Sequence, residues 1–389
     1  MNFLIKKSGL SDIYEKVAAG VRINESEALR LFKSEDLNAV GAIADLACQR
    51  KNGNRASYLL NRYINYSNYC ILSCQFCAFA RKKRDGDGFE LTIDQIVEKA
   101  REAKSYGATE LHIVGGLHPS LPFDYYTGFI KAIKNVNPAL QIKAFTAIEV
   151  LHLSWIGKKT VEETLVELKR AGLDCLTGGG AEIFNPDVRN KIARGKETAE
   201  EYLSVHRAWH KLGGRSTCTM LYGHIETYED RVDHLRRLRE LQDETGGFCG
   251  FIPLPYQPEN NEIPVKHPPT GIDTLKTIAL SRIFLDNINH ITAYWVGTGL
   301  KLAQIALNFG ADDLHGTIQE EYIFHMAGAK TPQSLTEQIL VRTIQETGKI
   351  AVQRNTFYEP LKVWDKPASG VSLSGAEAKA ILDSNLATG

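Results

Sequence analysis

From about residue 59 onward, short β-rich runs alternate with a turn and an amphipathic helical stretch, and the alternation continues to about residue 330. The apolar character of these runs is typical of parallel strands that helices cover. About eight such units in roughly 250 to 300 residues favour an α/β fold of the (βα)8 TIM-barrel type over a doubly wound sheet. We therefore expect strands at residues 59–66, 110–114, 141–146, 175–177, 216–222, 249–254, 290–296 and 313–314.

The segments on either side of the predicted barrel have a different pattern. At the N-terminus, leucine, valine and alanine recur at helical spacing over residues 11–19 and 26–32, which predicts a helical lead-in. At the other end, the run 335–352 predicts a helix that closes the barrel, followed by a tail rich in Ser, Gly, Ala and Asp that we expect to fray. The expected units are a helical segment, a barrel and a C-terminal helical extension, at residues 1–58, 59–330 and 331–389.

Charge and cysteine content exclude several classes of protein. The 46 basic and 46 acidic side chains cancel, so no net charge attracts the chain to nucleic acid. Seven cysteines are too few for a disulfide scaffold of 389 residues, and no secretory signal opens the sequence, which predicts a cytoplasmic protein with reduced thiols. The apolar runs fall short of the roughly 20 residues that a membrane-spanning helix needs. We therefore expect neither nucleic-acid binding nor a membrane span.

Three of the seven cysteines, Cys70, Cys74 and Cys77, fall within one short segment just after the first predicted strand. Their spacing is compatible with three small hydrophobic side chains on a buried helix face, although turn-like residues precede them. A structural zinc site needs a fourth ligand, and the other cysteines are isolated from one another. Three thiolates can instead hold three corners of a 4Fe-4S cube and leave the fourth iron open. All three interpretations explain the clustering.

Unusual residues also follow other predicted strands. Gly115-Gly116 comes after the second strand, and Glu182 follows the fourth strand beside Gly178-Gly-Gly. Alone, a glycine pair indicates a tight turn and Glu182 a solvated loop acid. Thr227 and Asp230 have the spacing of a capping box that begins a helix. Because the loops that follow the strands of a barrel gather on one face, we expect these residues to share that face with the cysteines.

The cysteine segment, with Phe76 immediately before the last cysteine at the end of a barrel's first strand, resembles the radical S-adenosylmethionine (SAM) superfamily. The resemblance implies an enzyme with a 4Fe-4S cluster on the three cysteines, which cleaves SAM to methionine and a 5′-deoxyadenosyl radical. It also implies that the backbone of the glycine pair binds the methionine ammonium group and that an acid after the fourth strand binds the ribose hydroxyls. The implied cofactor-binding residues are Phe76, Gly115, Gly116, Glu149 and Glu182.

At finer grain, the chain resembles the aminofutalosine (6-amino-6-deoxyfutalosine) synthases of the futalosine route to menaquinone. The matching segments are Phe76-Cys-Ala-Phe-Ala-Arg81, His112-Ile-Val-Gly-Gly-Leu-His118-Pro, Lys143-Ala-Phe-Thr146-Ala-Ile-Glu149, Gly178-Gly-Gly-Ala-Glu182, Tyr222-Gly-His224-Ile-Glu226 and Asp312-Asp313. The resemblance implies a transferase that consumes SAM. In this reaction the adenosyl radical adds to the enol-ether double bond of 3-(1-carboxyvinyloxy)benzoate, and rearrangement and decarboxylation give 6-amino-6-deoxyfutalosine.

Related activities remain open at this point. The dehypoxanthine futalosine cyclase of the same pathway and the deazaflavin F0 synthases are similar in sequence, and a structural zinc or iron-sulfur protein is the alternative outside enzymes. The implied substrate carries two carboxylates, so a dry pocket must supply donors to them. The resemblance further implies an external electron donor such as flavodoxin or ferredoxin. Candidates for substrate contact or catalysis are Arg81, His118, Thr146, His224 and Glu226.

Overall fold

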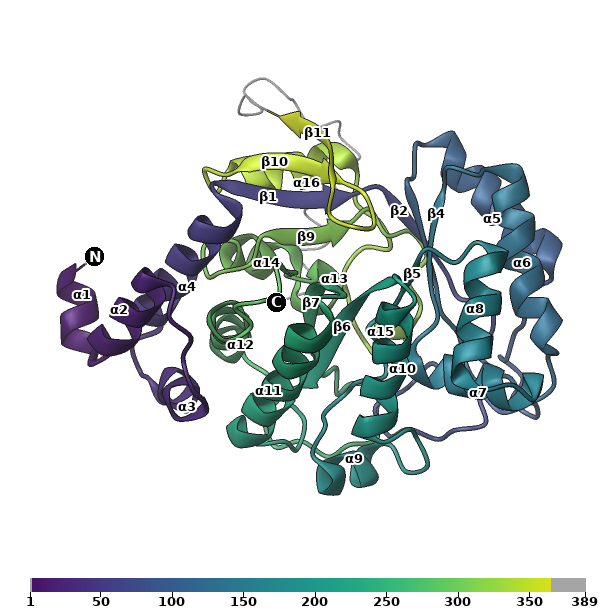
Figure 1. Ribbon diagram of the computed structural model, residues 1–389, viewed down its shortest axis with the longest axis horizontal. Helices are drawn as coiled ribbons and strands as arrows, with labels where there is room; N and C mark the ends of the chain where they lie inside the picture. The colour runs from purple at the N-terminus through teal and green to yellow at the C-terminus, as the bar shows by residue number, and fades with distance from the viewer. Residues whose placement is uncertain (1, 365–389) are drawn as a thin grey trace.

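Residues 2–364 are described by the structure, a computed structural model, and they begin with four helices at one end of the molecule (Figure 1). Asn24 caps the third of these helices through a capping box with Glu27. The fourth packs along the later helix α12 and so joins the lead-in to the rest of the chain. The predicted N-terminal helices are confirmed, with bounds α1 Asn2–Ser8, α2 Ser11–Ala19, α3 Glu25–Lys33 and α4 Leu37–Asn52.

Seven parallel strands form a curled sheet in which each strand pairs with the next one along the chain. This is the arrangement that repeated βα units predict. The strands match the expected positions, although several are shorter than the apolar runs that predict them. They are β2 Asn61–Ile64, β3 Glu110–Ile113, β4 Gln141–Ala144, β5 Cys175–Leu176, β6 Arg215–Tyr222, β7 Phe248–Pro255 and β8 His290–Ile291.

A further strand occupies the gap between the two ends of this sheet. β1 (Arg55–Leu59) leads directly into β2 and pairs with β9 (Asp313–Gly316). On its other side, β9 meets the end of β8 through a parallel bridge between Thr292 and Asp313. β9 therefore takes the eighth position of the barrel, so the expected α/β barrel is confirmed.

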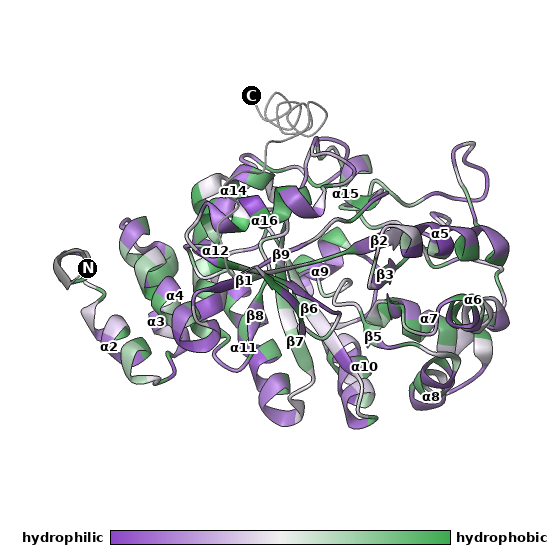
Figure 2. Cartoon of the chain, turned by 90° about the horizontal axis from the view of Figure 1, so that it is seen from above, coloured by the Kyte–Doolittle hydropathy of each residue, from purple (hydrophilic) through white to green (hydrophobic). Residues whose placement is uncertain are grey.

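An outer layer of helices covers the sheet, and hydrophilic and hydrophobic residues alternate along them (Figure 2). Five of the helices begin at a threonine whose side chain and the acid or glutamine three residues later form a capping box, and each such cap contributes about 1 kcal/mol. The caps are Thr92, Thr146, Thr160, Thr198 and Thr227. The helices after β2 are α5 Ile93–Ser105, α6 Phe123–Val136, α7 Ala147–Gly157, α8 Val161–Ala171, α9 Pro186–Ile192, α10 Ala199–Lys211, α11 Tyr228–Thr245, α12 Gly271–Phe284, α13 Trp295–Thr298, α14 Leu300–Ala306 and α15 Ile323–Met326.

The C-terminal segment differs from the expected continuous helix over residues 335–352. Only α16 (Glu337–Gln345) is helical, and the chain then turns at Gly348 with a φ of 83° and enters β10 (Ile350–Arg354). β10 pairs in parallel with β1 and antiparallel with β11 (Pro360–Trp364), in the order β11-β10-β1-β9. The residues after Gly348 therefore form a strand, because the backbone groups at the free edge of β1 pair with them. The predicted tail lies outside the described residues.

Among residues 2–364, none of the helices has the length and apolar character needed to cross a membrane.

Candidate functional site

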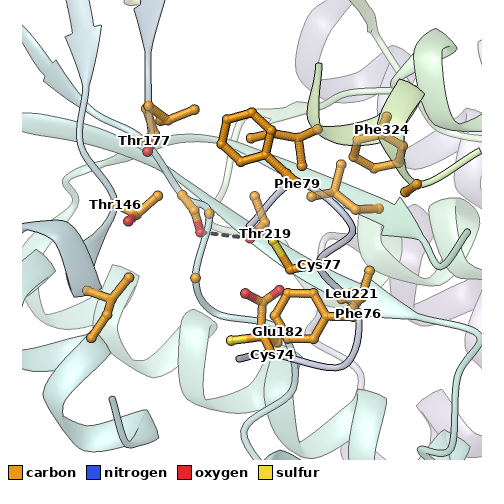
Figure 3. Close-up of a pocket in the computed structure, with 18 of the residues that line it drawn as sticks. Cys74, Phe76, Cys77, Phe79, Thr146, Thr177, Glu182, Thr219, Leu221 and Phe324 are labelled. Atoms are coloured by element: carbon orange, nitrogen blue, oxygen red, sulfur yellow. Dashed lines mark hydrogen bonds between the residues drawn. The ribbon is translucent and has the colours of Figure 1, made fainter. Parts of the chain in front are cut away.

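A cavity of about 270 Å³ opens where the strands of the barrel end. Its wall is formed by segments that directly follow strands: residues 114–117 after β3, 146–149 after β4 and 177–180 after β5. Nine of the residues that the sequence singles out line this one space, as Figure 3 shows in part. They are Cys70, Cys74, Phe76, Cys77, Gly115, Gly116, Thr146, Glu149 and Glu182.

The three cysteines lie in an irregular loop, not on a helix. This excludes the interpretation in which they fill one buried helix face. The ammonium group of Lys82 holds the start of the loop by donating to the carbonyl oxygens of Cys70, Ile71 and Leu72 at 3.0, 3.2 and 2.7 Å. All three thiols are free and line the cavity, and in Figure 3 Cys74 and Cys77 lie beside Phe76 and Glu182.

The thiols have the chemistry of iron-sulfur ligands. Burial raises the pKa of Cys74 to about 12 and also raises the pKa of Cys77, so both carry a proton until a metal displaces it. Within residues 2–364, no three His, Cys, Asp or Glu side chains converge as tightly as a single metal ion requires. A four-iron cube spreads its thiolates over separate irons and so needs a wider set. Three neighbouring thiols on one cavity wall fit that wider arrangement.

The glycine pair is needed because neighbouring groups approach it closely. A Cβ atom on Gly115 would lie 2.6 Å from the ring of Tyr66, and one on Gly116 would lie 2.3 Å from the carbonyl oxygen of Tyr69. The second contact is with backbone, which cannot rotate away as a side chain can. The Gly116 N–H donates to the carbonyl of Ser67 at 2.8 Å, which ties the pair to the segment that leads into the cysteine loop.

Glu149 connects the glycine pair to the start of α7. One carboxylate oxygen accepts from the N–H of Gly115 at 3.1 Å and from the hydroxyl of Tyr66 at 2.8 Å. The other accepts from both the N–H and the hydroxyl of Thr146 at 2.8 Å. Burial raises the pKa of Glu149, while these donors oppose the rise. Thr146 and Glu149 therefore shape the wall through a capping box.

Glu182 forms an ion pair with Lys196, a residue that the sequence analysis did not single out. The two charged atoms lie 2.7 Å apart, and the ammonium group sits 5.4 Å from the centre of the Phe76 ring. Although burial acts against its charge, the carboxylates of Glu182 and Glu197 raise the pKa of Lys196. Glu182 itself has a φ of 46°, a costly conformation for a residue with a Cβ atom. Lys196 follows Arg194-Gly195, a pattern typical of a solvated loop, so no sequence signal identified it.

Two of the candidate residues near the cysteine loop do not line the cavity. Arg81 forms an ion pair with Asp87 at 2.7 Å, and its guanidinium also donates to nearby carbonyl groups. His118 accepts on Nδ1 from the N–H groups of Ser120 and Leu121, so its Nε2 carries the proton and donates to Glu90 at 2.6 Å. Burial lowers the pKa of His118. The ring of His118 therefore stabilises the turn that follows it.

The candidate residues after β6 are also absent from the lining of the cavity. Glu226 accepts from the N–H groups of Gly223 and His224 at 2.6 and 2.9 Å and pairs with Arg231 at 2.8 Å. His224 bonds to backbone at both ring nitrogens, to Ile225 and Leu221. These contacts stabilise the loop before α11, and the predicted capping box of Thr227 and Asp230 is confirmed there. The expected substrate contact of His224 and Glu226 is therefore not supported.

Comparisons with known proteins agree with this geometry. A family model described as the Radical SAM superfamily matches residues 64–238, and one described as the CofH/MqnC C-terminal region matches residues 245–366. The chain is 43% identical to an aminodeoxyfutalosine synthase from Thermus thermophilus, over 93% of this chain and 98% of that protein. A second aminodeoxyfutalosine synthase, from Streptomyces coelicolor, is 41% identical over 92% and 95%.

Another curated relative has a different name. A cyclic dehypoxanthine futalosine synthase from Streptomyces coelicolor is 40% identical over 94% of this chain and 92% of its own length. Among solved structures, methylornithine synthase gives a TM-score of 0.70 at 17% identity over 95% and 99% of the two chains. The hydrogenase maturase HydG gives 0.72 at 18% identity over 92% and 80%. These two show the fold alone. The chain belongs to the radical SAM superfamily and, within it, to the futalosine-pathway family of enzymes that includes the aminodeoxyfutalosine synthases.

Proposed function

We propose that this chain is an aminodeoxyfutalosine synthase that joins the 5′-deoxyadenosyl group of SAM to 3-(1-carboxyvinyloxy)benzoate. When bound and reduced, the 4Fe-4S cluster supplies the electron that cleaves SAM, and the resulting radical adds to the enol-ether double bond. Rearrangement and loss of carbon dioxide or bicarbonate then give 6-amino-6-deoxyfutalosine. The proposal is supported by the names of relatives that are 41 to 43% identical over nearly their whole length.

The observation that carries the proposal is that three thiols, a glycine pair and a carboxylate face one cavity. We assign the cluster to Cys70, Cys74 and Cys77. This assignment follows from the chemistry of the donors and from the loop that Lys82 holds in place.

We assign SAM to the wall next to the cysteine loop. Gly115 and Gly116 line this wall, and their N–H groups are held by the carboxylate of Glu149 and the carbonyl of Ser67. Glu182 presents a carboxylate that Lys196 holds from one side, which suits a role in gripping ribose hydroxyls. Phe76 lies beside this pair.

The remaining wall excludes water from the reacting atoms. Apolar side chains from β6, β7 and α15 line the cavity opposite the glycine pair, among them Leu221, Ile252 and Phe324. A primary alkyl radical reacts with almost any neighbour, so the protein must hold the double bond in contact with C5′ and keep other groups away. A dry apolar wall achieves this without a general acid or base.

One incubation tests the proposal. Reconstituted enzyme, reduced chemically under anaerobic conditions, is given SAM and 3-(1-carboxyvinyloxy)benzoate, and the products are identified by mass. We expect a product that contains the adenosyl moiety and that forms in step with SAM consumption. If 5′-deoxyadenosine is the main nucleoside product in the presence of the true substrate, hydrogen abstraction replaces addition. The activity would then be closer to the one named for the 40% identical relative, the cyclic dehypoxanthine futalosine synthase. In a cell, we expect flavodoxin or ferredoxin to supply the electron.

A further inference from the structure

The cavity is lined at its inner end by four polar side chains, Tyr63, His112, Tyr294 and His315. Lys143 pairs in register with His112 and is buried beside this set. We call these five residues the floor. Tyr63 pairs in register with His112, and His112 with Lys143, so three neighbouring strands contribute one row. Tyr294 and His315 come from the closing side of the barrel. Inward positions of such barrels are usually branched aliphatic residues, so a polar row needs an explanation.

Lys143 is buried and has no direct partner in the described chain. Only 2% of the residue is exposed, and its ammonium group forms no hydrogen bond or ion pair with residues 2–364. It is close enough to the imidazoles of His112 and His315 to disfavour their protonation. A buried cation without a counter-charge is costly, and a bound anion would remove that cost.

The uncharged members of the floor also have unused bonding capacity. Nδ1 of His112 and Nδ1 of His315 are buried and have no hydrogen-bond partner in the described chain. The Tyr63 hydroxyl is 3.4 Å from both His315 Nε2 and the Tyr294 hydroxyl, which is long for a hydrogen bond. Burial lowers the pKa of both histidines well below the usual range, so each stays neutral and offers one N–H.

A second buried cation nearby is fully satisfied. Arg354 forms two hydrogen bonds to Asp313, at 2.6 and 3.0 Å. The buried carboxylate of Glu110 accepts only a 3.5 Å contact from Asn61 and forms no ion pair with Lys143 in the described chain. Arg354 is therefore paired inside the barrel, whereas Lys143 and Glu110 each lack a direct partner of opposite charge in the described chain.

We propose that the floor binds the ring carboxylate of an aromatic acid, with Lys143 as the counter-charge and the tyrosine and histidine rings as neutral donors. The identity of the acid rests on the proposed function, which places the enol ether at the cysteine end. The ring carboxylate, at the other end of that molecule, is then the group that reaches the floor. One cation matches one carboxylate, and apolar walls between the two ends accommodate the ring.

Binding of simple aromatic acids tests the floor without turnover. Holoenzyme with an oxidised cluster and SAM is titrated calorimetrically with 3-methoxybenzoate and with 3-methoxybenzamide, which differ in charge but hardly in shape. We expect the wild-type protein to prefer the acid by at least about tenfold, which is about 1.4 kcal/mol. Lys143→Met should reduce the preference to within about threefold, and Lys143→Arg should retain part of it. The matched control is Lys349→Met, since Lys349 is also buried but pairs with Asp45 at 3.2 Å.

Each outcome decides the proposal. Equal binding of acid and amide by the wild-type protein overturns it, even if the methionine variant does not fold. An unchanged preference in Lys143→Met overturns it as well, and so does an equal loss in the Lys349→Met control. A protein that prefers the acid but does not convert 3-(1-carboxyvinyloxy)benzoate would support the floor and reject the proposed function. A protein that converts the enol ether but does not prefer the acid over the amide would support the proposed function and reject the floor.

Discussion

The two ends of the cavity are built in different ways. The cysteine end, which we call the mouth, is formed by loops, with glycines and capping groups that fix the backbone, and each acid there has a partner within hydrogen-bonding distance. The floor is formed by side chains of regular strands, and its single ammonium group has no direct partner in the described chain. The difference indicates that the mouth is organised before ligands bind, whereas the floor keeps polar atoms that have no partner in the described chain and are free to bond to a ligand.

The largest expected effect is at the mouth. We predict that Cys77→Ser abolishes turnover and lowers the iron content of the reconstituted protein, because a hydroxyl replaces a thiolate ligand. Iron analysis, visible absorption and product formation measure this. The control is Cys48→Ala, since Cys48 is buried near Ala311 and does not line the cavity. If Cys77→Ser keeps its full iron content and activity, the assignment of the cluster to this loop is wrong.

The next prediction tests whether the mouth is organised by its backbone. Gly116→Ala places a Cβ atom 2.3 Å from the carbonyl oxygen of Tyr69, so the backbone must shift. A displacement of about 1 Å near the reacting groups costs roughly a hundredfold in rate, and we expect turnover to fall by about that factor. Product formation by the reconstituted, reduced enzyme measures it. Gly86→Ala is the control, because a Cβ atom there meets nothing within 4 Å.

A third prediction concerns the protonation of the buried Glu197 carboxyl group behind the mouth. Burial raises the pKa of Glu197 to about 7, and its carboxylate forms no hydrogen bond in the described chain. The folded protein therefore holds a proton that the unfolded chain releases between about pH 4.5 and 7, so stability falls as the pH rises through that window. Glu197→Gln should stabilise the protein at pH 8 by up to about 3 kcal/mol, and much less at pH 5.

Thermal unfolding of the wild type and of Glu197→Gln at the two pH values checks this sign. An equal change at pH 5 and pH 8 would show that Glu197 does not titrate in this window. Arg189 Nη2 lies 3.3 Å from the carboxylate, so a pKa at or below the usual value of glutamate would mean that this contact dominates over burial.

A smaller loss is expected where the mouth is supported by a capping box. Glu149→Gln replaces one of the two acceptor oxygens by an NH2 group, so it loses either the bonds from Gly115 and Tyr66 or those from Thr146. Leaving a buried donor unsatisfied costs about 1 to 3 kcal/mol, and we expect a loss of about 2 kcal/mol in the free energy of unfolding. Denaturant unfolding measures the loss. Glu163→Gln makes the same change in the exposed capping box of α8 and should cost less.

The smallest effect is predicted for a residue that motif matching places at the site. His118→Asn retains an acceptor for the N–H groups of Ser120 and Leu121, which is the contact that the ring makes. We expect the binding constants of SAM and of the aromatic acid to change by less than about twofold, because the ring lies outside the cavity lining. A large loss of affinity with unchanged unfolding would show that His118 reaches a ligand after all.

Much of the mouth could be predicted from the sequence, because the cysteines, the glycine pair and the acids all fall in loops that follow predicted strands, and such loops meet on one face of a barrel. The floor could not be predicted. His112 and Lys143 occupy ordinary alternate positions of two short strands, and His315 joins Tyr63 only because β9 closes the barrel from 252 residues away. Lys196 was missed for a similar reason, since only the folded chain brings it to Glu182.

The differences between expectation and structure have identifiable physical causes, and the substrate contact of His224 and Glu226 stays a prediction. Glu226 and His224 follow a strand as expected, but the free N–H groups of their own loop capture both side chains. The helical pattern after residue 345 is overridden because β1 offers an unpaired edge to Ile350–Arg354. Motif spacing predicts which loops meet, whereas side-chain direction depends on partners that are distant in sequence.

The buried lysine at the floor has a consequence for the lifetime of the protein. A ligand that binds only the folded state stabilises it, by about 2.7 kcal/mol at a hundredfold excess over its dissociation constant. Copies that hold an aromatic acid are therefore harder to melt than idle copies. If the chain consumes the aromatic acid as proposed, a shortage of that acid would leave more of the protein unfolded and open to proteases, so its abundance would follow the supply of the acid.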